Sequence, residues 1–193
     1  MSDTMIGTAV DGGFGDPPRD AARAFRAALQ ALSRPGTLHE IAGAVPPAPC
    51  SVAAGALLLT LCDAETGLYL APSLDTPELR DWVAFHTGAP IVEAGVADFA
   101  LGTWTDLAPL DRFKVGTQSY PDRAATLIVE MDAIAQSGSR LTGPGIADAA
   151  YLTLPEVAAF QANRRKFPLG FDTYFTCGSQ VAGLPRSTRV EDL

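Results

Sequence analysis

The chain has 193 residues, 47% of them hydrophobic and 19% charged, which predicts a single domain with a core of its own. A net charge of −8, from 14 basic and 22 acidic residues, argues against nucleic acid and anionic membranes as partners. The three cysteines are odd in number and lack Cys-x-x-Cys spacing, which predicts buried thiols in a reducing compartment. Since there is also no apolar run of membrane length and no secretion signal in residues 1–5, we expect a cytoplasmic protein.

The first predicted element is a helix that follows an irregular stretch over residues 1–15. Asp16 is its expected N-cap, Pro17-Pro18 occupy its first turn, and Pro35-Gly36 end it. Apolar residues recur along it at helical spacing, so we expect one inward face formed by Ala21, Phe25, Ala28, Leu29 and Leu32. Residues 37–41 are predicted to form a short strand.

Two further helices and a strand are predicted before residue 90. Ser51 is expected to cap a helix over residues 52–61 that is apolar nearly all round and therefore buried between layers. Residues 67–70 form a buried strand. The next helix begins at Thr76-Pro77 and ends near Thr87-Gly88, with three inward residues, Leu79, Trp82 and Val83.

Strands dominate the second half of the chain. Residues 99–104 are one strand, and the continuous apolar run over 125–131 predicts a central one. Leu141 leads into the turn Gly143-Pro144-Gly145, and Thr153-x-x-Glu156 indicates a capping box that opens a helix.

The last predicted element is a hairpin. Residues 171–177 and 181–184 flank Gly178-Ser179-Gln180, and strands joined this closely must be antiparallel. Helices interleaved with buried strands then predict a layered α/β sandwich over a mixed sheet, and we expect one domain over residues 1–193.

Catalytic motifs are scarce. The sequence contains no phosphate-binding loop, no Gly-x-Ser-x-Gly elbow and no cluster of cysteines and histidines for a metal. Gly143-x-Gly145 lacks the third glycine of a dinucleotide fingerprint. Of the two histidines, His39 is expected on the surface. His86 ends a helix, where it could hydrogen-bond the last carbonyls or contact a ligand or partner.

Two basic segments are candidate contact sites. Arg164-Arg165-Lys166 ends a helix, where cations offset the helix dipole, or it docks a phosphate or a partner's carboxylates. Arg186 lies after the hairpin in a tail that could grip an anion or another subunit, or be solvated.

Six segments in order resemble the PhnH family, the H subunit of the bacterial carbon–phosphorus lyase system for phosphonate use. The match runs from about Phe14 to the end of the chain. The segments are Phe25-Arg26 with Leu32-Ser33-Arg34-Pro35-Gly36, Phe85-His86-Thr87-Gly88-Ala89-Pro90, Pro121-Asp122-Arg123-Ala124-Ala125-Thr126-Leu127-Ile128, Leu141-Thr142-Gly143-Pro144-Gly145-Ile146, Phe167-Pro168-Leu169-Gly170-Phe171-Asp172 and Leu184-Pro185-Arg186-Ser187-Thr188.

The resemblance implies a fold, a function and partners. The implied fold is a three-layer α/β/α sandwich, similar to the large domain of pyridoxal-phosphate-dependent transferases but without their cofactor site. This sequence agrees, since neither Lys114 nor Lys166 is well placed to form a Schiff base. No other cofactor and no metal is expected.

The implied function is support for a synthase. The family's homodimer joins the G, I and J subunits, and with G, I and L it supports formation of ribose 1-phosphonate 5-triphosphate from ATP and a phosphonate, with displacement of adenine. The resemblance transfers no catalytic residue, and activity of the chain alone is not expected. His86, Gly143, Gly145, Arg164 and Arg186 are candidate ligand or subunit contacts. The alternatives are a stand-alone binding module or a cryptic enzyme that uses His86.

Overall fold

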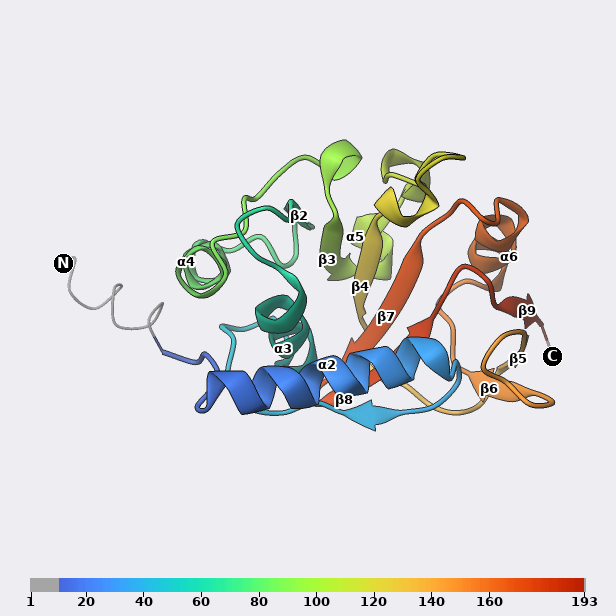
Figure 1. The fold of residues 1–193 in the computed structure, drawn as a ribbon, viewed down its shortest axis with the longest axis horizontal. Helices are drawn as coiled ribbons and strands as arrows, with labels where there is room; N and C mark the ends of the chain where they lie inside the picture. The colour runs from blue at the N-terminus through green and yellow to red at the C-terminus, as the bar shows by residue number, and fades with distance from the viewer. Residues whose placement is uncertain (1–10, 193) are drawn as a thin grey trace.

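The computed structural model describes residues 11–192, which form an α/β fold around a six-stranded sheet with the strand order β1-β8-β7-β4-β3-β2 (Figure 1). Four neighbouring strands are parallel, namely β2 (Leu68–Leu70), β3 (Phe99–Thr103), β4 (Thr126–Glu130) and β7 (Asp172–Cys177). Two antiparallel strands complete the sheet, β8 (Gln180–Leu184) and β1 (His39–Glu40). The predicted mixed sheet is confirmed, with β4 and β7 in its centre.

Helices cover both faces of this sheet. On one face lie α2 (Pro17–Ser33), α3 (Val52–Leu61) and α4 (Pro77–His86). On the other lie α5 (Trp104–Leu107) and α6 (Val157–Arg165), together with a small antiparallel sheet that the sequence did not predict. That sheet consists of β5 (Ser139–Thr142), β6 (Ala150–Leu152) and β9 (Arg189–Glu191). Three short 3-10 helices lie in the loops, η1 (Ala94–Val96), η2 (Leu110–Arg112) and η3 (Pro121–Arg123).

The strands supply both halves of the core because neighbouring side chains on a strand point to opposite faces. In β4, Ile128 packs with α2, α3 and α4, whereas Leu127 and Val129 pack with α6 and the small sheet. In β7, Tyr174 and Phe175 divide in the same way. An apolar run without alternation, such as residues 125–131, is therefore what a strand covered on both faces requires.

The predicted starts of α3 and α4 are confirmed. The Ser51 hydroxyl accepts a hydrogen bond from the Ala54 N–H, and the Thr76 hydroxyl accepts one from the Leu79 N–H. Each satisfies an amide that the first turn of a helix leaves without a partner.

The predicted inward face of α2 is wrong for Phe25 and Leu29, although Ala28 is buried and Leu32 packs against the core. Phe25 and Leu29 are exposed, whereas the buried residues are Ala24, Ala28 and Ala31. The helix lies so close to β8 that a Cβ on Gly183 would come within 2.6 Å of Ala31. Only small side chains fit between the two elements, so the large apolar side chains point elsewhere.

The capping box at residues 153–156 is also wrong. The Thr153 hydroxyl donates to the carbonyls of Ala135 and Ser137 in a neighbouring segment, and α6 begins only at Val157. The Glu156 carboxylate instead accepts a hydrogen bond from the Trp104 indole N–H at 3.1 Å. Long-range partners have replaced the local ones.

The surface and thiol predictions hold in part. Cys50 and Cys62 are buried, but Cys177 is half-buried, as is His39. Within residues 11–192, each helix is too short or too polar to cross a membrane.

Candidate functional site

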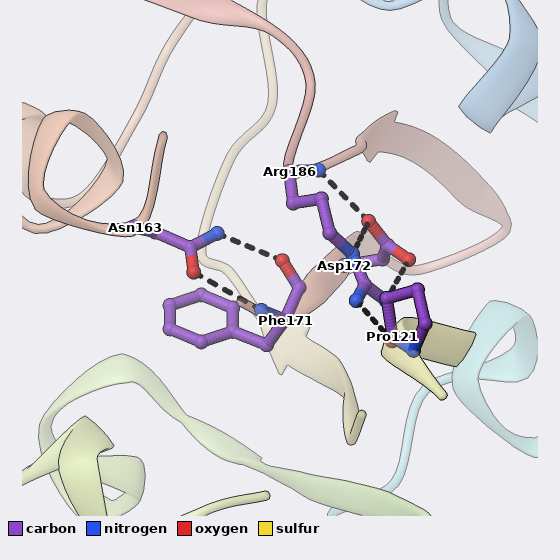
Figure 2. Close-up of polar contacts among 5 residues, drawn as sticks. All are labelled: Pro121, Asn163, Phe171, Asp172 and Arg186. Atoms are coloured by element: carbon purple, nitrogen blue, oxygen red, sulfur yellow. Dashed lines mark hydrogen bonds and ion pairs between the residues drawn. The ribbon is translucent and has the colours of Figure 1, made fainter. Parts of the chain in front are cut away.

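Most hydrogen-bond donors of Arg186 are bound to other residues of the same chain (Figure 2). Its Nε and Nη2 donate to the two carboxylate oxygens of Asp172 at 3.1 and 2.7 Å, and its backbone N–H donates to the same carboxylate at 2.8 Å. Its Nη1 donates to the Pro121 carbonyl at 2.7 Å. The two charged side chains are only 13% and 25% exposed, so the pair is largely shielded from water. The sequence offered no partner for Arg186.

The β7–β8 hairpin explains why these two residues meet. Asp172 is the first residue of β7, and Thr173 pairs with Leu184 at the end of β8. The chain leaving β8 therefore returns to the amino end of β7, where Arg186 lies beside Asp172. Since Pro121 begins η3 just before β4, the guanidinium joins three segments that are distant in sequence.

Asn163 makes a second connection at the same end of β7. Its side-chain amide donates to the Phe171 carbonyl at 2.8 Å, and its side-chain oxygen accepts from the Phe171 N–H at 3.0 Å (Figure 2). Gly170 adopts φ +119°, and a Cβ there would collide with the Asn163 side-chain oxygen. The end of α6 is thus fixed to the start of β7, and the glycine makes the close approach possible.

Gly143 and Gly145 form a tight turn that contacts two other family segments. Gly145 adopts φ +82°, and a Cβ there would collide with the Ser33 carbonyl oxygen at the end of α2. Gly143 adopts φ +135° and faces the Ser187 carbonyl. The next regular element is strand β6, not the helix that a dinucleotide fingerprint would open. The turn therefore packs against the end of α2 and against the segment at Ser187.

Arg164 lies in the last turn of α6, where a cation offsets the helix dipole. Its guanidinium stacks 4.8 Å from the centre of the Phe167 ring. Among residues 11–192 its buried Nε has no hydrogen-bond partner.

His86 lies away from these residues, since α4 and α6 cover opposite faces of the sheet (Figure 1). Its ring packs 5.0 Å from the ring of Trp82, and its Nε2 lies 3.3 Å from the Asp11 carbonyl oxygen. The helix-end bond considered for it is made by Thr87, whose hydroxyl donates to the Val83 carbonyl. His86 also lines a cavity of about 370 Å³, with Phe14 and Leu59 among its neighbours.

Sequence reasoning missed Glu130, the last residue of the central strand β4. One carboxylate oxygen accepts from the Ser51 N–H at 2.7 Å, and the other accepts from the Thr176 hydroxyl at 2.9 Å. Burial raises the pKa of Glu130, although these hydrogen bonds oppose the shift. The available signal was that Glu130 is the one charged residue in the apolar run 125–131.

The candidate residues do not form one reactive constellation. Gly143, Gly145, Arg164 and Arg186 lie on the side of the sheet that α6 and the small sheet cover, and His86 lies apart from them. Within residues 11–192, no three of the His, Cys, Asp and Glu side chains gather as metal ligands. Five of the six family segments contact one another, and the segment that contains His86 lies apart from them.

This is an α/β protein in which segments distant in sequence are held together by three contacts. They are the shielded Arg186–Asp172 ion pair, the hydrogen bonds between Asn163 and Phe171, and the turn at Gly143 and Gly145. The family model for a bacterial phosphonate metabolism protein, PhnH, matches residues 12–191. The chain belongs to the PhnH family, as the six segments suggested.

Two relatives extend the comparison. The chain is 39% identical over 192 residues to the alpha-D-ribose 1-methylphosphonate 5-triphosphate synthase subunit PhnH of Rhizobium meliloti (strain 1021), covering 93% of this chain and 94% of that protein. It is 29% identical over 174 residues to HtxG of Stutzerimonas stutzeri, whose name provisionally describes a C-P lyase subunit protein, covering 86% and 84%.

Proposed function

We propose that this protein is a subunit of the synthase that forms alpha-D-ribose 1-methylphosphonate 5-triphosphate during phosphonate breakdown. The observation that carries the proposal is the 39% identity to a subunit of that synthase over nearly the full length of both chains. Family membership over residues 12–191 supports the same assignment to phosphonate metabolism.

We propose that the protein contributes by assembly and not by chemistry of its own. Polar groups at the family segments already bind within the protein: Arg186 binds Asp172 and Pro121, and Asn163 binds Phe171. Bonds of this kind fix a shape that other subunits can recognise. The partners would be a second copy of the chain and the G, I, J and L subunits, within the cytoplasm, and the chain would act as one domain.

We propose that the fold is related to the large domain of pyridoxal-phosphate-dependent transferases, but that the corresponding position does not hold the cofactor. A helix N-terminus beyond the carboxyl end of a parallel strand is the usual phosphate site in such folds. Here the first amides of α3 are occupied by the protein itself. Glu130 accepts from the Ser51 N–H, the Gly178 carbonyl accepts from the Ala53 N–H, and the Ser51 hydroxyl accepts from the Ala54 N–H.

The lysines support the same conclusion. Lys114 is paired with Asp98, and Lys166 is an exposed residue at the end of α6. A Schiff base requires an unprotonated amine, which neither an ion-paired nor a fully solvated lysine readily provides. The carboxylate of Glu130 would also repel a phosphate at α3.

The test is co-expression of the tagged protein with the other synthase subunits of the same host, followed by affinity purification. We expect them to purify together, and a strain that lacks this subunit should not grow with methylphosphonate as its only phosphorus source. Separate purification together with normal growth of the deletion strain would contradict the proposal.

The cavity beside His86 favours one rival, a binding module that acts alone. Calorimetry of the isolated chain with ATP and with methylphosphonate distinguishes the two. Heat of binding that His86→Ala abolishes, in the absence of other subunits, would support the rival.

A further inference from the structure

Helix α2 carries a second apolar face, which is exposed in the part of the chain that the structure describes. Its members are spaced by four, three and four residues, and we name them the outer seam: Pro18, Ala22, Phe25 and Leu29. All four are exposed, and the two large side chains are 53% and 57% exposed. This spacing is the one with which a helix presents a continuous stripe to another helix.

Packing of α2 on the sheet explains why the seam stays outside. The face that meets β8 consists of Ala24, Ala28 and Ala31, and contact with Gly183 leaves no room for larger groups. Phe25 and Leu29 are therefore directed away from the core. Exposed aromatic and leucine side chains aligned along one helix are typical of a surface that another protein covers.

Charge indicates what covers the seam. The span Pro17–Ser33 contains three arginines and one aspartate, a local charge of +2, in a chain whose net charge is −8. Arg19 and Arg23 lie near Asp16 and Asp20, but Arg26 has no ion pair within residues 11–192. At helical spacing Arg26 falls directly beside Ala22 and Leu29, on the solvent side of the outer seam. A basic border of this kind fits carboxylates.

We propose that the outer seam of α2 docks an amphipathic helix of a partner protein whose own apolar stripe is bordered by aspartate or glutamate. This rests on the proposed function, because it assigns the docking surface of an assembly subunit. A second copy of α2 fits less well, since two basic borders would meet. Burial of Phe25 and Leu29 provides most of the binding free energy. The charge of Arg26 orients the partner and raises the association rate.

The experiment is the same co-purification, carried out with a double variant, Phe25→Glu with Leu29→Glu, and with the matched control Val96→Glu. Val96 is 62% exposed and lies in η1, away from α2. We expect the double variant to lose at least about 100-fold in affinity for the assembly, and the control to bind as the wild type does. Both should keep the wild-type melting temperature, because the replaced side chains are exposed.

A charge variant tests the second half of the proposal. Arg26→Glu should weaken binding about tenfold at low salt, and the difference should shrink as the ionic strength rises. The control is Arg189→Glu, at an exposed position in β9.

The outcomes separate the two proposals. If wild type and double variant both co-purify, the docking surface is overturned while the proposed function stands. If the double variant instead turns a dimer into a monomer and still joins the other subunits, a second copy covers the seam, which also overturns it. If the wild type fails to co-purify, the proposed function fails and this inference falls with it.

Discussion

The carboxylate of Glu130, at the end of the central strand, accepts a hydrogen bond from the backbone N–H of Ser51, the N-cap of helix α3. A charged group at this depth is held by two hydrogen bonds and by the positive end of the helix dipole. Burial nevertheless dominates and raises the pKa of Glu130 above its ordinary value of 4.5.

This raised pKa predicts a pH dependence of stability. The folded protein holds the proton of Glu130 more tightly than the unfolded chain does. The stabilisation from that proton is therefore fully present below about pH 4.5 and is lost as the pH rises through the folded pKa. Glu130→Gln should gain stability relative to the wild type as the pH rises from about 4.5 to 7, as measured by urea unfolding.

The control for Glu130→Gln is Glu65→Gln, at an exposed position. Its unfolding curves should follow those of the wild type at every pH. If the Glu130→Gln and wild-type free energies ran parallel across the range, Glu130 would not be the group responsible.

Removal of Arg186 should cost far more than removal of an exposed arginine. Arg186→Ala leaves the shielded carboxylate of Asp172 without its partner, and we expect a loss of about 2–4 kcal/mol in unfolding free energy. The matched control is Arg140→Ala, whose pair with Glu191 is 36% and 56% exposed, so its loss should be much smaller. Thermal and chemical unfolding measure both losses. Equal losses would show that Arg186 contributes no more than a surface contact.

Gly145 should tolerate no side chain. Gly145→Ala combines a positive φ with a Cβ placed against the Ser33 carbonyl, so we expect a loss of at least about 2 kcal/mol. Gly15→Ala is the control, since a Cβ added there would have nothing within 4 Å, and it should change stability by less than about 0.5 kcal/mol. A neutral Gly145→Ala would mean that α2 and this turn separate at little cost.

The cap of α3 should contribute modestly. Ser51→Ala removes the hydroxyl that accepts from Ala54 but keeps the backbone N–H that donates to Glu130, so a loss of about 1 kcal/mol is expected. Ser51→Gly should cost less, because a glycine lets water reach the free amide. Equilibrium unfolding of the two variants would decide the order, and the reverse order would contradict the capping argument.

Features with local causes were the ones that the sequence predicted. The starts of α3 and α4 follow from a hydroxyl three residues before the amide it caps, and both ends of that contact are visible in the sequence. The hairpin was predictable for the same reason, since Gly178 and Ser179 directly join its strands.

Features with distant causes were missed or wrong. Which side of α2 is buried depends on Gly183, a residue of another element, and no periodicity within the helix reveals it. The partner of Arg186 is likewise set by the hairpin register and by the loop at Pro121. Thr153 had a plausible local role and takes a long-range one. The family resemblance identified the segments but not their contacts.

Strand β1 has a consequence for how the protein is made. In the described sheet β1 hydrogen-bonds only to β8, with Glu40 opposite Gln180. β1 therefore cannot pair until β8, far later in the sequence, has been synthesised. On a ribosome, α2 and β1 emerge long before the surface on which they rest has been synthesised. The apolar faces of α2 and β1 therefore stay uncovered until β8 has been synthesised, and this late pairing of an early segment is expected to slow folding.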